Sequence, residues 1–491
     1  MNLANLSKQD TIIAPATAPG MGAIAVIRIS GPESIGITDK FFYSFKKGKT
    51  LSSVKTHTAN FGEIKNGDLV IDEVLVNVFH DGKSFTGEET VEISCHGSTY
   101  ITQTIIQLFV DAQIRPADAG EFTMRAYRNG KFDLSQAEAV ADLIHSTSKA
   151  SSQLALSQLK GGVGSEIEKL REKLLNFASL IELELDFSEE DVEFADRTDF
   201  INLVKSIQAL IEKLMTSFAL GNAIKNGVPV AIVGAPNVGK STLLNALLEE
   251  DRAIVSEIAG TTRDTIEDEL NIEGITYRFI DTAGIRKTED IIENKGIEKT
   301  FQKMDIARVI IQVFDVTATT PLEIEKRAES LKSKYPTQEL LIVLNKVDLI
   351  QKANEADTSD AKRNELNDML GERDLNLTFN WKLNTKGVTF IPISAKSDKG
   401  ISKIKSELTK LIDLGTLNTG DIIISNARHY NSLKEANESL TNALTALETG
   451  LPSDLLAIDI RAALHALGSI TGQITTEDLL RNIFGKFCIG K

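Results

Sequence analysis

Cysteine is scarce in this sequence, with Cys95 and Cys488 the only two among 491 residues. This scarcity excludes a disulfide scaffold and fits a reducing cytosol. Long hydrophobic runs are also missing, since none approaches the roughly 20 residues that span a bilayer. The first ten residues lack the basic-then-apolar pattern of a signal peptide. We therefore expect a cytoplasmic protein without a membrane anchor.

An excess of basic charge is absent as well, because 54 lysines and arginines stand against 69 acidic residues, a net charge of −15. Strong binding to nucleic acid by overall attraction is thus excluded, and any contact with RNA requires a local basic patch or a partner. The histidines and cysteines form no HExxH or CxxC pair. A zinc site therefore has little support, whereas cations bound by oxygen atoms stay open.

What is present is enough chain for roughly three domains. Residues 1–130 mix short β-rich runs, such as Gly22–Ser30 and Val74–Phe79, with glycine and proline, which indicates an α/β domain. A helical pattern follows. The capping box Ser135–Glu138 is predicted to open one helical run that stops at the glycine pair 161–162.

Strands and helices then alternate between about residues 228 and 411. Near-continuous apolar runs in this region predict a parallel sheet covered on both faces: Val228–Val233, Val309–Phe314 and Leu340–Leu344. Helical patterns return after Asp421, and Thr475 is the predicted cap of the last one, Glu477–Ile483.

The two helical regions are most simply one discontinuous domain with the α/β unit inserted into it, since insertions succeed where chain termini lie close together. The predicted division has three parts. They are an N-terminal domain of residues 1–130, a helical domain of residues 131–224 and 418–491, and an inserted domain of residues 225–417.

The segment Gly234-Ala-Pro-Asn-Val-Gly-Lys-Ser241 follows a predicted strand and opens a helical run, which is the context of a P-loop. Its glycines let backbone N–H groups curl around phosphate oxygens at a helix N-terminus. Lys240 should then reach the β- and γ-phosphates, and the Ser241 hydroxyl should ligate Mg²⁺.

Further segments occur in the order of a GTPase. Asp281–Gly284 supplies a carboxylate near Mg²⁺ and a glycine N–H for the γ-phosphate. Asn345–Asp348 supplies a carboxylate that accepts two hydrogen bonds from guanine, a donor pair that adenine lacks. Ser394–Lys396 would close over the base, and Ser256–Asp264 is the predicted switch I. The predicted GTP-binding residues are Asn237, Val238, Gly239, Lys240, Ser241, Thr242, Ser256, Glu257, Ile258, Ala259, Gly260, Thr261, Thr262, Asp281, Thr282, Ala283, Gly284, Asn345, Lys346, Val347, Asp348, Ser394, Ala395 and Lys396.

One position departs from Ras-like GTPases, which place a water-orienting glutamine just after Asp-Thr-Ala-Gly, where this chain has Ile285. Another group must therefore position the nucleophile and neutralise charge. The amide of Asn237 would lie beside the phosphates, where two roles stay open: holding a monovalent cation, or only stabilising the loop.

Three other motifs extend the pattern over nearly the whole chain: Gly120–Thr123, Asn129–Ala139 and the terminal Phe487–Lys491. With them, the sequence resembles the MnmE (TrmE) family of tRNA-modification GTPases. The resemblance implies an α/β multidomain fold with a folate-binding-like N-terminal α/β domain, a discontinuous helical domain and an inserted Ras-like P-loop GTPase domain. It also implies a GTP-hydrolysing enzyme that adds an aminomethyl or carboxymethylaminomethyl group at C5 of the wobble uridine of certain tRNAs.

The same resemblance implies partners and cofactors. The family acts as a homodimer in a heterotetramer with the flavoprotein MnmG (GidA), which carries the flavin, and takes one carbon from 5-formyltetrahydrofolate or a related reduced folate. By position, the folate contacts are Arg28, Glu92, Lys131 and Lys491. Mg²⁺ is assigned to Ser241 and Thr262, and K⁺ to Asn237, Ser256, Ile258 and Thr261.

For catalysis, the resemblance implies that Glu293 orients water, alongside Lys240 and Asp281. For Cys488 two roles stay open, a nucleophilic or redox thiol and the organisation of the tail. The alternative function is a regulatory or ribosome-assembly GTPase without modification chemistry. That alternative predicts a basic RNA-binding appendage, and the net charge of −15 speaks against it.

Overall fold

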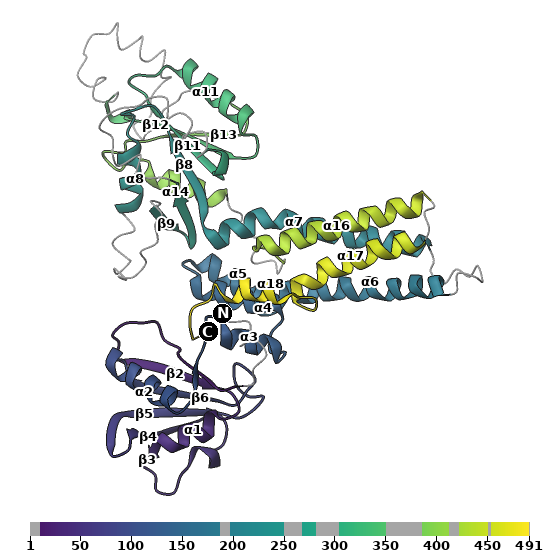
Figure 1. The fold of residues 1–491 in the computed structure, drawn as a ribbon. Coiled ribbons are helices and arrows are strands. Elements are labelled where there is room, and N and C mark those ends of the chain that lie inside the picture. The colour runs from purple at the N-terminus through teal and green to yellow at the C-terminus, as the bar shows by residue number, and fades with distance from the viewer. Residues whose placement is uncertain are drawn as a thin grey trace. The chain divides into compact units, whose positions relative to one another are not determined.

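The computed structural model describes residues 10–186, 197–249, 268–280, 304–349, 385–411, 422–449 and 453–490. The chain forms two compact units (Figure 1). Unit 1 comprises Met1–His145, Ala155–Met215 and Arg428–Lys491, and unit 2 comprises Ser146–Leu154 and Thr216–Ala427. Segments from both ends of the chain thus share unit 1. The division into three domains, with its boundaries, stays a prediction.

Unit 1 contains a seven-stranded sheet in the order β3-β4-β5-β6-β2-β1-β7. Its strands are β1 (Ile12–Pro15), β2 (Ile24–Ser30), β3 (Phe42–Ser44), β4 (Thr58–Asn66), β5 (Leu69–Phe79), β6 (Thr90–His96) and β7 (Arg115–Pro116). All neighbours are antiparallel except β1 and β7. The β-rich runs of the sequence therefore predicted real strands, and only their starting residues differ.

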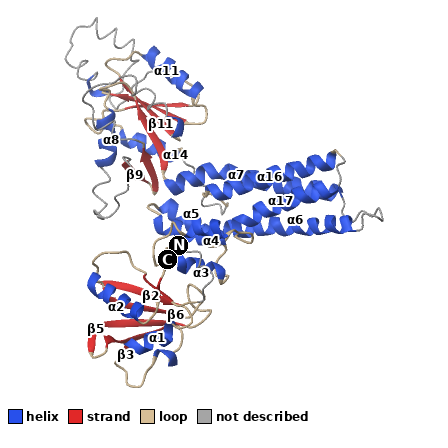
Figure 2. Ribbon diagram, viewed as in Figure 1, coloured by secondary structure: helices blue, strands red, loops and turns tan. Residues whose placement is uncertain are grey.

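One face of this sheet is covered by α1 (Ser34–Phe41) and α2 (Thr99–Asp111), which Figure 2 labels. The short helix η2 (Leu51–Ser53) adds Leu51 to the same core. Alternate strand residues such as Ile27 and Ile93 are fully buried in that core. Since successive side chains of a strand point to opposite faces, the residues between them lie on the other face. Arg28 and Glu92 are two of these.

The other regular elements in the described residues of unit 1 are helices. Its helices are α3 (Glu121–Arg128), α4 (Leu134–His145), α6 (Gly162–Asp186), α16 (Ala427–Glu448), α17 (Ser453–Thr471) and α18 (Glu477–Phe484), while the division places parts of α5 (Lys149–Leu159) and α7 (Arg197–Asn226) in each unit. In Figure 1, α6 and α17 lie side by side. No helix of the described ranges combines the length and the apolar character needed to cross a bilayer.

Two predicted helix caps were wrong, although the predicted start of the last helix at Glu477 is confirmed. Asp133 caps α4, since its carboxylate accepts a hydrogen bond from Gln136 N while the Gln136 side chain accepts one from Asp133 N. The predicted box two residues later does not form, because Glu138 is used elsewhere. The run is also two helices, α4 and α5, and Thr476 rather than Thr475 caps α18.

Unit 2 contains a six-stranded sheet in the order β13-β12-β11-β8-β10-β9, parallel except for the edge strand β9. Its strands are β8 (Val228–Val233), β9 (Asp268–Ile272), β10 (Ile275–Phe279), β11 (Val309–Asp315), β12 (Glu339–Asn345) and β13 (Val388–Pro392). Helices α8 (Lys240–Glu249) and α14 (Ile401–Lys410) cover one face, and α11 (Pro321–Lys334) covers the other. The predicted parallel sheet, buried on both sides, is confirmed.

Glu138 on α4 joins three helices of unit 1. Its carboxylate accepts hydrogen bonds from Arg428 Nη2 at 2.7 Å and from His429 Nε2 at 2.8 Å, both on α16. Arg428 also donates to the carbonyl oxygens of Ser469 and Ile470 on α17. Burial alone would raise the pKa of Glu138, but His429 and then Arg428 outweigh burial and lower the pKa to about 2.

We expect Glu138→Gln to lower the free energy of unfolding of unit 1 by about 3 kcal/mol at pH 7, because the substitution leaves Arg428 without its buried carboxylate. A pKa lowered by folding stabilises the protein above the unfolded value of 4.5 and loses that effect as the pH falls towards 2. The difference between wild type and variant should therefore shrink over this window. Hydrogen exchange of peptides from α4 and α16, followed in urea at several pH values, measures this difference in the free energy of unfolding.

The matched control is Glu438→Gln on α16, since Glu438 faces Lys434 at 3.8 Å on the surface, with its side chain 65% exposed. An exposed pair contributes little to stability. An equal decrease in the free energy of unfolding in the two variants would show that the buried ion pair stabilises unit 1 no more than an exposed pair does.

Candidate functional site

The P-loop connects β8 to α8 in unit 2. Three of its residues have positive φ angles: Gly234 at 156°, Asn237 at 61° and Gly239 at 99°. Lys240 Nζ donates to the carbonyl oxygens of Gly234 and Ala235, at 2.9 and 2.7 Å. The loop therefore curls around its own lysine at the N-terminus of a helix, which is the geometry that favours phosphate.

Asn345, the last residue of β12, holds the P-loop against a second loop. Its side-chain nitrogen donates to Val238 O at 2.8 Å, and its side-chain oxygen accepts from Ala395 N at 3.0 Å. A Cβ at Gly239 would lie 2.2 Å from this nitrogen, so the P-loop needs glycine there. Asn345 thus brings together two of the sequence-predicted segments from opposite ends of unit 2.

Asp348 and Ser394 meet beside this junction, where Ser394 Oγ donates to Asp348 Oδ1 at 2.7 Å. Ser394 is fully buried, whereas the Asp348 side chain is half-buried. One carboxylate oxygen is therefore held by the protein in a fixed orientation. A carboxylate fixed in this way presents acceptors to a paired donor such as the guanine edge.

Asp315 at the end of β11 is a residue that the sequence reasoning missed. It accepts hydrogen bonds from Lys346 Nζ at 2.5 Å and from Thr317 N and Oγ1. Burial would raise the pKa of Asp315, but these hydrogen bonds outweigh it and lower the pKa below its ordinary value. Lys346 has a φ of 69°, which turns the lysine out of the strand path. The available signal was an acidic residue directly after a predicted buried strand.

Several predicted site residues lie outside the described residues. These are Ser256, Glu257, Ile258, Ala259, Gly260, Thr261, Thr262, Asp281, Thr282, Ala283, Gly284, Glu293 and Lys491. The described part of the nucleotide site consists of the P-loop, Asn345–Asp348 and Ser394–Lys396. Among these residues Ser241 lies half-buried, and Thr242 and Lys396 are exposed.

In unit 1, Arg28 and Glu92 face each other across β2 and β6. Arg28 donates from Nε and Nη2 to Glu92 Oε1, at 2.9 and 2.8 Å. The Arg28 guanidinium carbon lies 5.3 Å from the Phe85 ring centre and 5.6 Å from that of Phe122. We call Arg28, Phe85, Glu92 and Phe122 the Arg28 cluster. It combines an ion pair about one-fifth exposed with an aromatic wall.

The Nζ of Lys131, a predicted folate residue, donates to Gly82 O at 2.7 Å. The C-terminal tail returns to the N-terminal part of unit 1. Cys488 is exposed, and its carbonyl oxygen accepts from Gly120 N at 3.4 Å. A Cβ at Gly490 would overlap Pro15 O. Gly490 thus lies next to β1, whose residue Ala14 pairs with Arg28.

Comparison with known proteins supports one family. The profile of the MnmE helical domain matches residues 134–488, and that of the GTP-binding protein TrmE N-terminus matches residues 11–131. The tRNA modification GTPase MnmE of Flavobacterium johnsoniae is 54% identical over 98% of this chain and 99% of its own length. Proteins of the same name from Christiangramia forsetii and Bacteroides thetaiotaomicron are 52% and 48% identical, each over 98% of this chain and 99% and 100% of their own lengths.

Among solved structures, the FeoB G-domain from Methanococcus jannaschii is 23% identical and covers 37% of this chain and 96% of its own, with a TM-score of 0.22. A score this low supports no conclusion about the fold. The matched profiles and the relatives instead agree over almost the whole length, from the N-terminal sheet to the tail. The chain therefore belongs to the MnmE (TrmE) family.

Proposed function

We propose that this chain is a GTP-hydrolysing enzyme of tRNA modification. The observation that carries the proposal is the Asn345 side chain, which joins the phosphate loop to the Ser394–Lys396 loop. A P-loop held against a guanine-type carboxylate is a nucleotide site, and the relatives that match the whole chain bear the name tRNA modification GTPase. The same named relatives favour this function over a regulatory or ribosome-assembly GTPase.

The nucleotide site is proposed to take GTP with Mg²⁺. The curled P-loop with Lys240 fits the phosphates, and Ser241 at the start of α8 fits a hydroxyl ligand for the metal. Mg²⁺ neutralises the charge of the β- and γ-phosphates when bound. Asp348 selects guanine. Lys346, two residues before it in the sequence, is held by Asp315. In our proposal Thr262 adds a metal ligand, and Lys240, Asp281 and Glu293 take the catalytic roles.

We further propose that the tRNA chemistry is addition of an aminomethyl or carboxymethylaminomethyl group at C5 of the wobble uridine. The flavin comes with the partner MnmG (GidA) in a heterotetramer, and the chain itself is a cytoplasmic homodimer. A reduced folate such as 5-formyltetrahydrofolate supplies the carbon. The Arg28 cluster supports folate binding, because an aromatic wall next to a guanidinium and a carboxylate suits a flat ring with polar edges.

The experiment that tests the function is complementation of a strain lacking this gene, followed by mass analysis of its tRNA wobble nucleosides. The full chain should restore the C5-modified uridine. If the purified protein hydrolyses GTP normally but the full chain does not restore the modified uridine, the regulatory GTPase is favoured.

Asp348→Asn should weaken GTP binding by about 1 to 3 kcal/mol, because an amide cannot accept both guanine hydrogen bonds. Xanthosine triphosphate should restore binding, since xanthine has a carbonyl in place of the exocyclic amine. Titration with fluorescent nucleotides measures both affinities. The matched control is Asp398→Asn, an exposed carboxylate of the neighbouring loop, which should change neither. Loss of binding to both nucleotides would mean that Asp348 has only a structural role.

GTP turnover should be about 10²-fold faster in K⁺ than in Na⁺, because the proposed site is sized for the larger ion and a site without its ion lacks a charge that stabilises the transition state. In our proposal Asn237, Ser256, Ile258 and Thr261 hold the ion. Asn237→Gly tests the amide cleanly, because glycine adopts the φ of 61° without strain. This variant should lose the stimulation and keep nucleotide affinity. If the stimulation persists, the amide only stabilises the loop.

Deletion of residues 488–491 should abolish wobble modification in cells and weaken reduced-folate binding, because Cys488 and Gly490 tie the tail to the N-terminal part of unit 1. GTP hydrolysis should stay within a few-fold of normal, since the nucleotide site belongs to unit 2. Cys488→Ala in the full chain is the companion variant. It should keep modification if the tail only organises the site and lose it if the thiol reacts. A truncated chain that restores the nucleoside would refute the role of the tail.

A further inference from the structure

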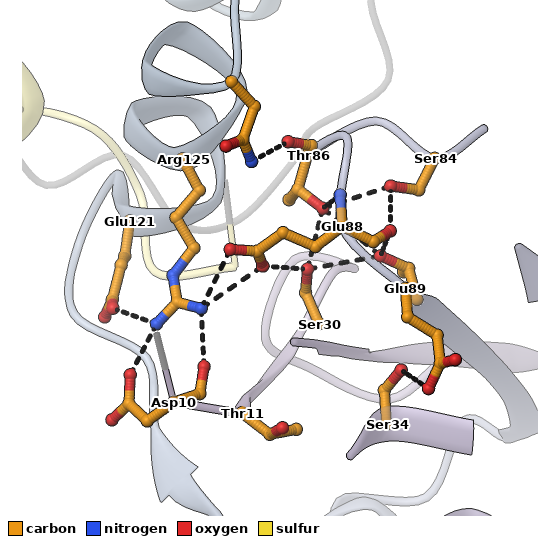
Figure 3. Close-up of polar contacts among 12 residues, drawn as sticks. Asp10, Thr11, Ser30, Ser34, Ser84, Thr86, Glu88, Glu89, Glu121 and Arg125 are labelled. Carbon is orange, nitrogen blue, oxygen red and sulfur yellow. Dashed lines mark hydrogen bonds and ion pairs between the residues drawn. The ribbon is translucent and has the colours of Figure 1, made fainter. Parts of the chain in front are cut away.

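The guanidinium of Arg125 on α3 lies at the centre of a polar network in unit 1 (Figure 3). It donates to Asp10 Oδ1 at 2.8 Å, to Glu121 Oε1 at 3.0 Å and to Glu88 Oε2 at 3.2 Å. Arg115 binds Asp10 and Glu121 as well. Three carboxylates and two guanidinium groups thus meet here, with Glu121 fully buried and Arg125 5% exposed.

Glu88 extends this network from α3 to the sheet. Its Oε2 accepts a hydrogen bond from Ser30 Oγ on β2 at 2.8 Å. Ser30 Oγ lies 2.7 Å from Thr86 Oγ1 and 3.2 Å from Thr90 Oγ1, and all three residues are buried. The hydroxyl of Ser84 also donates to Glu88 O. The network therefore connects α3, β2, β6 and the loop before β6. We call Asp10, Ser30, Ser84, Thr86, Glu88, Thr90, Arg115, Glu121 and Arg125 the Arg125 network.

Every residue of the Arg28 cluster is at most two residues away in the sequence from a member of the Arg125 network. On the strands, Ser30 pairs with Thr90 and Arg28 pairs with Glu92. Since residues two apart share a face of a strand, these pairs are successive rungs of one face. The two phenylalanines are placed even more directly, because Phe85 lies between Ser84 and Thr86 and Phe122 follows Glu121.

Stability is a poor reason for such a network, because buried ion pairs often contribute less than well-packed apolar side chains. The geometry of the network explains its presence better. The network fixes four segments, α3, β2, β6 and the loop before β6, and these segments meet at the Arg28 cluster. We propose that the Arg125 network positions Arg28, Glu92 and Phe85 for the reduced folate, with Glu88 as its main positioning residue. This inference rests on the proposed folate binding.

The test is calorimetric titration of the full-length protein with 5-formyltetrahydrofolate. Glu88→Gln keeps the length of the side chain and removes its charge, and it should weaken binding by about tenfold, as substitutions that disorient the ligands of a site do. Ser30→Ala, which removes the hydroxyl that Glu88 binds, should act in the same direction. GTP hydrolysis should be unchanged in both, because the nucleotide site belongs to unit 2.

The matched control is Asp39→Asn in the same unit, since the Asp39 carboxylate accepts hydrogen bonds from Leu51 N, Ser52 N and Ser52 Oγ away from the Arg28 cluster. It should lower the melting temperature and leave folate affinity normal. Equal weakening in Asp39→Asn and Glu88→Gln would overturn the inference, because the effect would then be one of general stability.

Arg28→Ala separates the inference from the function on which it rests. If Arg28→Ala loses binding while Glu88→Gln and Ser30→Ala bind as the wild type does, the positioning role is wrong and the folate site stands. If the wild type does not bind the folate, or Arg28→Ala binds it normally, the folate assignment is wrong, and the inference falls with it.

Discussion

The described part of the nucleotide site depends on one neutral side chain, the amide of Asn345. It donates to Val238 O in the P-loop and accepts from Ala395 N in the loop after β13. A backbone donor and a backbone acceptor that are buried need partners, and this amide supplies both at once. The approach is so close that a side chain at Gly239 would displace it. This contact ties the P-loop to the loop whose Ser394 binds Asp348.

Much of unit 2 could be predicted from the sequence because its physics is local. A strand buried on both faces must be apolar throughout, so the apolar runs Val228–Val233 and Val309–Phe314 predict two of the strands. The carboxyl ends of parallel strands meet at one edge, and this brings the segments after β8, β12 and β13 together without further information. The ion pair of Asp315 and Lys346 escaped prediction, since it depends on how two of those ends are turned.

The wrong helix cap predicted at Ser135 has a long-range cause. Two overlapping capping patterns, starting at Asp133 and at Ser135, fit the local sequence equally well. The choice is made by Arg428 and His429, which bind Glu138 from almost 300 residues away in the chain. A side chain needed in a buried ion pair is not available to cap a helix. The local sequence cannot predict this, because the partners of the ion pair lie far away in the chain. The Arg125 network is similar, since it joins residues from Asp10 to Arg125.

The two units solve the same problem with different chemistry. In our proposal each unit holds loops from distant parts of the chain around a polar ligand, a nucleotide in unit 2 and a reduced folate in unit 1. The connecting group is a neutral amide in unit 2 and a set of ions in unit 1. A carboxylate in place of Asn345 would repel phosphate, and an ammonium there would alter the field that Lys240 provides. The Arg28 cluster contains a matched ion pair, so its surroundings tolerate charge. If both proposed sites hold, the ligand of each one limits which side chains can support it.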